Sequence, residues 1–135
     1  MNYRRSFIRK IAGLGFLTTN LSLFNPLQAY APDKKYFLHH VFFWLKNPEN
    51  PGDREVFERA LGELGTVETI QLLHIGKPAD TNRDVIDNTY HYSFLAGFSD
   101  KAGHDVYQAH PIHDRFRTEY SHLWSKVLVY DSVNV

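Results

Sequence analysis

The sequence contains no cysteine, and this absence excludes several kinds of chemistry. Without thiols the chain forms no disulfides and no thiolate metal sites, and it has no cysteine nucleophile. Its 135 residues are enough for one domain with a hydrophobic core and too few for two. Hydrophobic residues make up 43% of the chain and aromatic residues 15%, which indicates an ordered globular protein.

Acidic residues are absent from positions 1–31, although the formal net charge of the whole chain is zero. This stretch carries four basic residues, Arg4, Arg5, Arg9 and Lys10. Without them, 11 of the 15 basic residues remain against 15 acidic ones, a net charge of −4. A mildly acidic domain is not attracted to nucleic acid or to an anionic membrane surface, so we expect neither as a partner.

The N-terminal part also lacks an apolar run long enough for a membrane-spanning helix. Its uncharged, largely apolar run covers residues 11–24, shorter than the roughly 20 residues that a bilayer requires. The run follows the paired Arg4-Arg5 and precedes Ala29-Tyr30-Ala31, whose small residues suit a signal peptidase. This order predicts a twin-arginine signal peptide over residues 1–31 and an exported, periplasmic bacterial domain over residues 32–135.

Two alternatives to a cleaved signal stay open. One is an uncleaved signal that anchors the domain, and the other is a permanent membrane helix. Once the signal is removed, we expect no stable insertion of the domain into a membrane.

Hydrophobic patterns in the rest of the chain predict four strands. They are expected at residues 36–45, 67–75, 90–98 and 126–133. In the third of these, alternation places Tyr90, Tyr92, Phe94, Ala96 and Phe98 on one face. The polar residues 77–87 are expected to form a surface loop.

Helices are expected between these strands. The first is capped by Asp53, stops at Gly65 and has one apolar face, made of Val56, Phe57, Ala60, Leu61 and Leu64. The second is capped by Ser99 and runs to about Ala109. It continues as a separate piece from Pro111, because proline suits the first position of a helix. In that piece the apolar stripe is Ile112, Phe116, Tyr120 and Leu123.

The order strand, helix, strand, strand, two-piece helix, strand predicts an α+β protein with the ferredoxin-like split βαβ fold. Such a fold has a single four-stranded antiparallel sheet with helices on one face. Aromatic residues lie on both sides of the strands, so the uncovered face is expected to be apolar and to need a partner. Two copies packed sheet to sheet would bury it, which predicts a homodimer with a cavity in each half.

A phenol and two imidazoles gather in the segment Tyr107-Gln108-Ala109-His110-Pro111-Ile112-His113. Histidine titrates near neutral pH and tyrosine donates or accepts hydrogen bonds, so these side chains can move protons. The break at Pro111 can bring Tyr107 and His113 to the same side. The alternative is structural, with His110 donating to a backbone carbonyl and Tyr107 packing at the rim.

Several motifs follow one another in order along residues 35–132. They are His40-Val41 in the first strand, Gly76 after the second, the third strand, Tyr107-x-x-His110-Pro111-x-His113, and Val129-Tyr130-Asp131 in the last strand. Together they resemble the stress-responsive A/B-barrel (Dabb) family of the dimeric α+β barrel superfamily. This resemblance implies a dimeric α+β barrel with a small-molecule pocket between the sheet and the helices of each protomer.

The resemblance also implies roles for individual residues. One plant member of the family is a polyketide cyclase that catalyses an intramolecular aldol condensation without a metal or organic cofactor. Its catalytic tyrosine and histidine correspond to Tyr107 and His113, and its pocket-lining histidine and its aspartate to His40 and Asp131. His113 would remove a proton next to a carbonyl, Tyr107 would stabilise the oxyanion, and Asp131 would hold the other imidazole nitrogen of His113. With His110, we expect His40 and Asp131 to be substrate-binding residues.

Eight histidines raise the question of a metal or haem site. No His-Glu-x-x-His or similar ligand pattern is present, and the neighbours His39 and His40 must point to opposite faces of a strand. We expect no metal and no cofactor; haem binding stays an alternative because the superfamily includes haem-handling relatives. Surface or structural positions are expected for His39, His74, His91, His104 and His122.

Two classes of function remain, and the sequence does not decide whether the protein is an enzyme. The first is cofactor-independent acid–base catalysis, aldol- or cyclase-like, on a small carbonyl-bearing molecule. The second is a non-catalytic dimeric module that binds a small hydrophobic ligand or serves a structural role. A cofactor-free monooxygenase is a weaker third class, because such enzymes are similar in fold.

Overall fold

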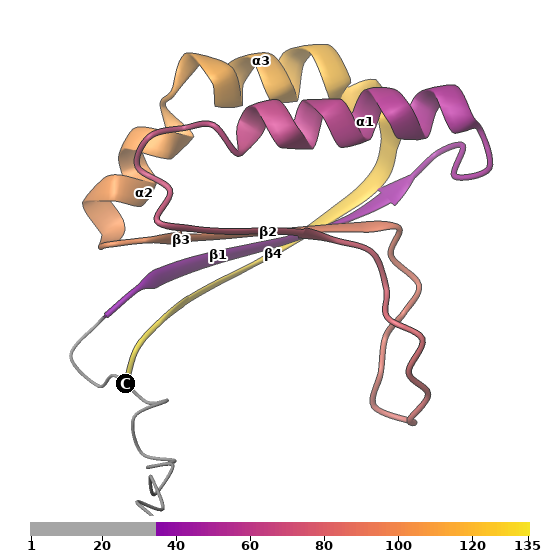
Figure 1. Cartoon of the computed structure of the whole chain (residues 1–135), viewed down its shortest axis with the longest axis horizontal. Coiled ribbons are helices and arrows are strands. Elements are labelled where there is room, and N and C mark those ends of the chain that lie inside the picture. The colour runs from indigo at the N-terminus through magenta and orange to yellow at the C-terminus, as the bar shows by residue number, and fades with distance from the viewer. Residues whose placement is uncertain (1–34) are drawn as a thin grey trace, which may run out of the picture. The chain divides into compact units, whose positions relative to one another are not determined.

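The structure, a computed structural model, describes residues 35–135. The predicted export signal and its cleavage site lie outside this range. The elements are β1 (Phe37–Leu45), α1 (Pro51–Leu64), β2 (Leu72–Gly76), β3 (Tyr92–Phe98), α2 (Lys101–Gln108), α3 (Pro111–Tyr120), a 3-10 turn (Ser121–Leu123) and β4 (Trp124–Val133), shown in Figure 1. No helix of this part of the chain is long and apolar enough to cross a bilayer.

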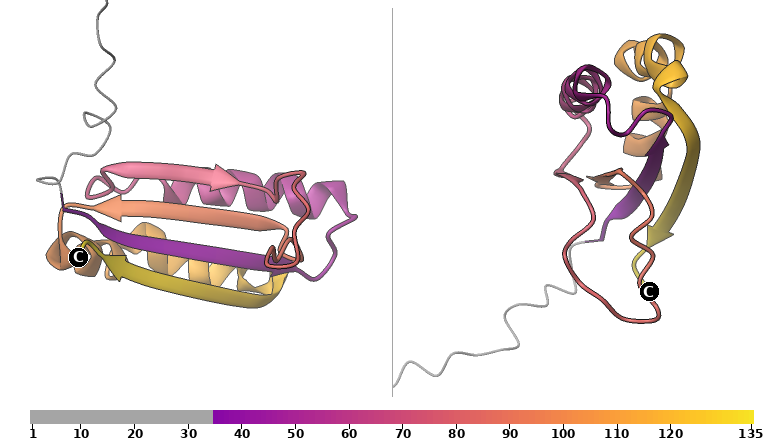
Figure 2. Two further views of the ribbon diagram at one scale, coloured as in Figure 1. Left: turned by 90° about the horizontal axis from the view of Figure 1, so that it is seen from below. Right: turned by 90° about the vertical axis from the view of Figure 1, so that its right-hand side faces the viewer.

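The four strands form one antiparallel sheet in the order β2-β3-β1-β4. All three α-helices of the described residues lie on one side of it, and the four strands are seen uncovered from the opposite side (Figure 2, left). This arrangement confirms the predicted ferredoxin-like fold, in which β1 and β3 are central and β2 and β4 are edges.

The hydrophobic core fills the space between the sheet and the helices. Alternation in β1 and β3 sends one set of side chains into this space, and Phe94, Ala96 and Phe98 are fully buried there. The predicted apolar face of α1 meets them, with Phe57 and Leu61 also fully buried. Phe57 makes ring contacts with Phe43, Tyr92, Phe116 and Trp124, so it joins α1 to both the sheet and α3.

Both predicted helix caps are wrong by one or a few residues. Helix α1 is capped by Asn50, whose side chain accepts from the backbone N–H groups of Gly52 and Asp53, so Asp53 lies within the first turn. Helix α2 is capped by Asp100, which accepts from Gly103 N–H at 2.9 Å, where Ser99 had been expected. Asn, Asp and Ser are all good caps, so residue type alone could not place these helix starts.

The strand ends also differ from the prediction. Strand β2 begins at Leu72, because Val67 is buried in the turn that follows α1 and not in the sheet. Strand β3 begins at Tyr92, two residues later than expected, and β4 begins earlier, at Trp124. The predicted surface loop is confirmed: residues 77–91 connect β2 to β3 without helix or strand (Figure 1).

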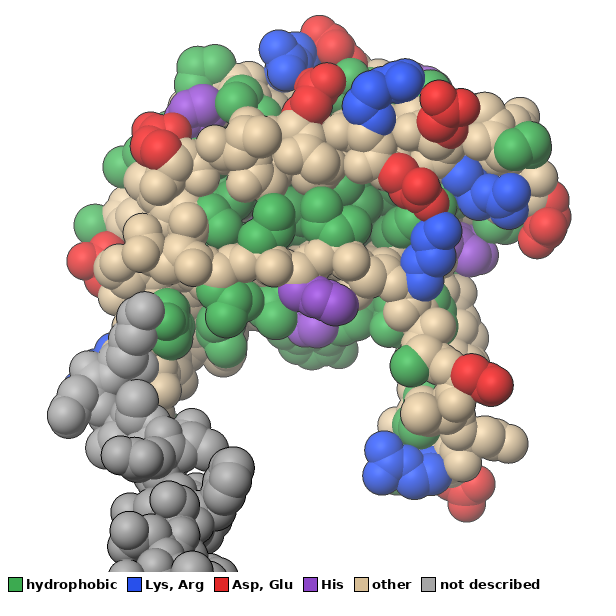
Figure 3. All heavy atoms as spheres, in the orientation of Figure 1, with side chains coloured by type: hydrophobic (Ala, Val, Ile, Leu, Met, Phe, Trp, Pro, Cys, Tyr) green, Lys and Arg blue, Asp and Glu red, His purple; other side chains and the backbone are tan. Residues whose placement is uncertain are grey.

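The side of the sheet away from the helices, here called the open face, is apolar as predicted. Hydrophobic side chains gather below the sheet in Figure 3. The side chains on this face come from all four strands and include Phe42, Trp44, Leu72, Leu95, Leu128 and Tyr130. Tyr130 is 60% exposed and Leu128 36%, so much of the open face is uncovered within residues 35–135, although Tyr90 packs against Phe42 and Trp44 at one end.

Candidate acid–base pocket

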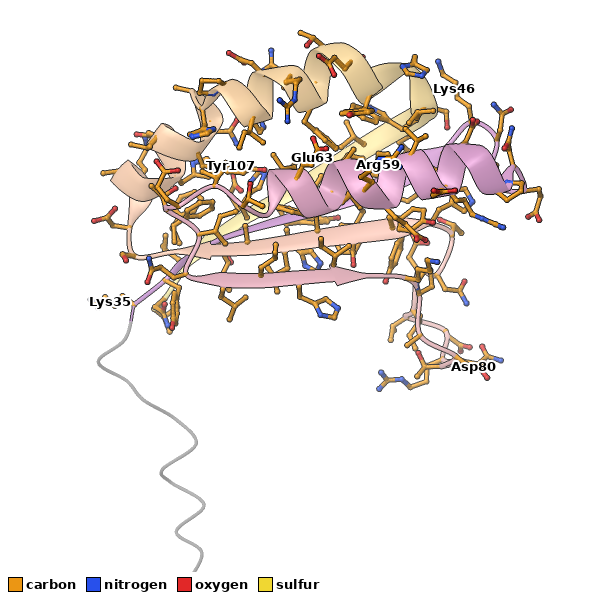
Figure 4. The ribbon with its side chains drawn as sticks, turned by 45° about the horizontal axis from the view of Figure 1, so that its top comes forward. Lys35, Lys46, Arg59, Glu63, Asp80 and Tyr107 are labelled. Atoms are coloured by element: carbon orange, nitrogen blue, oxygen red, sulfur yellow. The ribbon has the colours of Figure 1, made fainter. Side chains whose placement is uncertain are left out.

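A corner between two helices brings Tyr107 and His113 together. Helix α2 ends at Gln108 and α3 starts at Pro111, as the proline predicted. His110 caps α3 by accepting the Ile112 N–H at Nδ1, over 3.1 Å. Tyr107 therefore lies in the last turn of one helix and His113 in the first turn of the next, with ring centroids 4.8 Å apart. Tyr107 is labelled in Figure 4, where it lies between α2 and the sheet.

These two side chains line a pocket of about 220 Å³ between the sheet and the α2–α3 corner. We call it the helix-side pocket. Its lining is mostly apolar: His39, Val41, Phe43, Leu64, Phe94, Tyr107, Gln108, His113, Phe116, Arg117, Trp124, Val127 and Val129. Val127 and Val129 belong to the edge strand β4 and are 45% and 43% exposed, so the pocket reaches the surface along that edge.

Tyr107 is almost completely buried, at 1% exposure. Its ring packs on Phe98 and Phe94, with centroids 5.2 Å and 6.5 Å away. Within residues 35–135 its hydroxyl makes no hydrogen bond, so the proton is available to a bound molecule. Burial raises the pKa of this hydroxyl well above its ordinary value of 10.0, and Tyr107 is therefore a hydrogen-bond donor at neutral pH.

His113 is buried as well, at 8% exposure, and its Nδ1 has no hydrogen-bond partner in the described part of the chain. Burial lowers the pKa of His113 below 6.5, and the charges of Arg117 and His39 act in the same direction. Asp114 and the Gln108 backbone oppose this shift in pKa without reversing it. The imidazole is therefore neutral near pH 7, the form that can accept a proton.

Asp131 binds His39 and not His113, which corrects the predicted pairing. The distance from His39 Nδ1 to Asp131 Oδ1 is 2.7 Å. The sheet register explains it, because β4 pairs with β1 so that Asp131 lies directly opposite His39. His39 is 5% exposed and lines the helix-side pocket, where its ring centroid is 5.7 Å from that of Tyr107.

His40 lies on the open face, so the structure does not bring this predicted substrate-binding residue to the helix-side pocket. Neighbouring side chains of a strand point to opposite faces, and in β1 His39 and Val41 are buried while His40 is only partly buried. Its ring contacts Phe42 at 4.2 Å. The period-2 pattern itself could have identified His39, because it shares a face with the core residues Val41 and Phe43.

His110 lies at the helix corner but does not line the helix-side pocket. Its Nδ1 accepts the Ile112 N–H, and its Nε2 is 3.4 Å from Glu68 Oε2. The alternative of a structural role for His110 was right about the residue but wrong about its hydrogen bond, because His110 accepts from the backbone and does not donate to it. Of the five predicted site residues, Tyr107 and His113 meet in the pocket, and Asp131 reaches it through His39.

The remaining histidines divide between surface and interior. His74 and His122 are exposed, and His91 accepts the Leu45 N–H over 2.8 Å, which is a structural role. His104 is buried at 8% exposure beside His39, their ring centroids 5.0 Å apart. Burial and the neighbouring His39 lower the pKa of His104, while Asp131 and Asp105 oppose that change.

The family comparison agrees with the fold. The Stress responsive A/B Barrel Domain (Dabb) family matches residues 37–134. The chain belongs to the Dabb family. No curated protein matches the chain in sequence.

Several solved structures are similar to this Dabb protein. A Dabb family protein from Mesorhizobium loti is 25% identical, with 75% of this chain and 98% of that chain covered and a TM-score of 0.62. A hydroxynitrile lyase from Passiflora edulis is 16% identical, with coverages of 76% and 95% and a TM-score of 0.62. A dimeric ferredoxin-like protein of unknown function from Thermobifida fusca is also 16% identical, with coverages of 76% and 93% and a TM-score of 0.60. At 16% identity the last two are similar in fold alone.

Proposed function

We propose that this Dabb protein binds a small carbonyl-bearing molecule in the helix-side pocket and moves a proton on it without a cofactor. The observation that carries the proposal is that two polar groups meet at one apolar pocket. His113 Nδ1 is buried without a hydrogen-bond partner, and the Tyr107 hydroxyl makes no hydrogen bond within residues 35–135. A buried polar group without a partner costs folding free energy. Such a cost is typical of sites where a ligand completes the hydrogen bonds.

The chemistry follows from the protonation states. Neutral His113 removes a proton next to the carbonyl, and Tyr107 donates a hydrogen bond to the oxygen on which negative charge develops. The His39–Asp131 pair stands on the adjacent wall and supplies a second imidazole whose orientation is fixed by a carboxylate. One positioned base contributes about 10²–10⁴-fold to a rate, so the substrate must already be activated, as a 1,3-diketone is.

One protein of similar fold is an enzyme. The Passiflora edulis protein is a hydroxynitrile lyase, so this fold can carry an enzyme. The second candidate is a non-catalytic module for a small hydrophobic ligand. The apolar lining of the helix-side pocket and its modest volume of about 220 Å³ favour such a ligand in either case.

The same proposal includes a homodimer formed through the open face, and export by the twin-arginine route. Exposed apolar side chains on all four strands support the first part, as does the dimeric state of the Thermobifida fusca protein. The paired Arg4-Arg5 and the run over residues 11–24 support the second. Replacing Arg4-Arg5 with lysines should stop export by this route, and continued translocation would contradict it.

Deuterium exchange tests the catalytic part without knowledge of the natural substrate. Full-length protein is incubated in deuterated buffer with small 1,3-diketones and aromatic ketones, and NMR follows exchange next to the carbonyl. We expect the protein to accelerate exchange, and the rate to rise with pH through the lowered pKa of His113 and level off above it, since only neutral imidazole accepts a proton. His113→Gln and Tyr107→Phe should each lower the rate about 10²-fold or more, and the exposed His122→Gln should not change it.

Two outcomes decide between the candidates. If ketones bind in NMR titrations and no exchange is accelerated, the non-catalytic module is favoured. If exchange is accelerated equally by wild type, His113→Gln and Tyr107→Phe, the helix-side pocket is not the site.

A further inference from the structure

Three side chains beside the helix-side pocket form a cluster that the acid–base proposal uses only in part. His39 from β1, His104 from α2 and Asp131 from β4 each offer one ligand atom, and these atoms all lie within 4.8 Å of one another. His39 and His104 are buried, and the Asp131 side chain is 44% exposed. No other group of this kind exists among the residues that the structure describes.

We propose that His39, His104 and Asp131 form a binding site for a divalent transition-metal ion such as zinc. Two imidazole nitrogens and one carboxylate oxygen suit zinc, cobalt, nickel or copper, and they do not suit magnesium or calcium, which prefer all-oxygen sites. Three protein ligands leave at least one coordination position for water or another molecule. The inference goes beyond the proposed function, which needs no metal.

The surroundings hold the two imidazoles in place. His104 stacks on Phe37 at 4.4 Å and meets Phe98 edge to face at 5.4 Å, and its ring centroid is 5.0 Å from that of His39. On the same helix, one nitrogen of His104 has a hydrogen-bond partner and the other lies near a carboxylate. Gln108 lies 3.1 Å from Nε2 and Asp105 lies 3.8 Å from Nδ1. Such outer partners orient a metal-binding histidine.

The spacing requires one small adjustment. Ligands of a tetrahedral zinc ion lie roughly 3.3 Å apart, because each bond is about 2.0–2.1 Å long. His39 Nδ1 and Asp131 Oδ1 are now 2.7 Å apart and share a proton. An ion that replaced this proton would push them slightly apart and draw His104 closer. Asp131 is the exposed member of the cluster, on an edge strand, and it can move to accommodate the ion.

The proposed metal site lies next to the helix-side pocket. His39 belongs both to the metal cluster and to the lining of the helix-side pocket. The open coordination position therefore lies near the pocket, and the molecules expected to bind to the ion carry an oxygen donor such as a carbonyl or carboxylate.

Metal titration tests the proposal on the full chain, purified without a polyhistidine tag. Zinc binding is measured by calorimetry against a chelator, and cobalt binding by visible absorption. We expect one zinc ion per chain, with shifts of the His39 and His104 ring signals in NMR, and no binding of magnesium under the same conditions. His104→Phe, which keeps the aromatic packing, and Asp131→Asn, at a more exposed position, should each weaken zinc binding by about 100-fold or more.

Matched variants separate this site from other histidines and from the acid–base chemistry. The exposed His122→Ala should keep wild-type zinc affinity, and so should Tyr107→Phe, although it loses ketone exchange. If zinc binds equally to wild type, His104→Phe and Asp131→Asn, or does not bind to wild type at all, the proposed site is wrong.

Circular dichroism checks folding, and Asp131→Asn keeps the test decisive if His104→Phe does not fold. Zinc binding without ketone exchange would overturn the proposed function alone, and exchange without zinc binding would overturn this site alone.

Discussion

At the scale of single residues, two buried tyrosines differ in what their hydroxyls do. Tyr92 donates to Glu58 Oε1 over 2.6 Å, whereas the Tyr107 hydroxyl has no partner within residues 35–135. A hydroxyl in a hydrogen bond stabilises the fold, and an unpaired one does not. The difference assigns a structural role to the hydroxyl of Tyr92 and leaves that of Tyr107 free for a ligand.

This contrast predicts opposite results for the same substitution. Tyr92→Phe should lower the free energy of unfolding by about 1 kcal/mol, because it removes a hydrogen bond to a carboxylate that is partly exposed. Tyr107→Phe should change it by less than about 0.5 kcal/mol in either direction, because no hydrogen bond is lost. Urea unfolding of both variants gives the comparison. A loss of about 2 kcal/mol for Tyr107→Phe would mean that its hydroxyl holds the fold together.

Only those parts of the candidate site that depend on neighbouring residues in the sequence could be predicted. The spacing of Tyr107, Pro111 and His113 predicted a helix break and two side chains on one side of it, and the structure has both. The partner of Asp131 depends on how β4 pairs with β1, a register between segments about 90 residues apart, which no local pattern encodes. The choice between His39 and His40 needed only the strand alternation.

At the scale of secondary-structure elements, the start of α2 determines where Tyr107 lies. Asp100 caps this short helix through Gly103 N–H, and Ser99 does not take part. We expect Asp100→Ala to lower the free energy of unfolding by about 1 kcal/mol, because a helix N-terminus loses its side-chain acceptor. Ser99→Ala is the matched control and should change it by no more than about 0.5 kcal/mol. Equal losses in urea unfolding would mean that the cap is shared.

The elements themselves were more predictable than their ends. In α1 the apolar residues recur on one face over fourteen positions, and this pattern survives any uncertainty about the cap. Strand β2 is the opposite case: it has five residues, and the apolar Val67 before it belongs to a buried turn. An apolar residue is buried in a turn as well as in a strand, so hydrophobicity could not mark where the sheet begins.

At the scale of the whole molecule, the sheet separates the pocket proposed to bind a ligand from the open face proposed to form the dimer. The helix-side pocket lies on one face, and the open face carries Phe42, Leu128 and Tyr130 on the other. Phe42 and Tyr130 meet edge to face, with centroids 6.1 Å apart. The loop of residues 77–91 extends beyond this same face (Figure 1), where a second copy would meet it.

A single charge on the open face tests the proposed dimer. Leu128→Asp should convert the dimer to a monomer at micromolar concentration, because a carboxylate would be buried without a partner between two sheets. Val106→Asp is the matched control: Val106 is 49% exposed on α2, away from the open face, and the variant should stay dimeric. Light scattering after size exclusion gives the mass. A monomeric wild type, or a dimeric Leu128→Asp, would contradict pairing through this face.

Strand β1 contributes side chains to both faces of the sheet. Its odd-numbered residues lie on one face and its even-numbered residues on the other. His39, Val41 and Phe43 point toward the helices, while His40, Phe42 and Trp44 point away. One residue inserted between His40 and Val41 would leave Val41 and Phe43 in the core but turn His39 outward and His40 inward. The insertion would separate His39 from Tyr107 and place the imidazole of His40 in the pocket instead. The length of this strand is therefore constrained more tightly than the identity of most of its side chains.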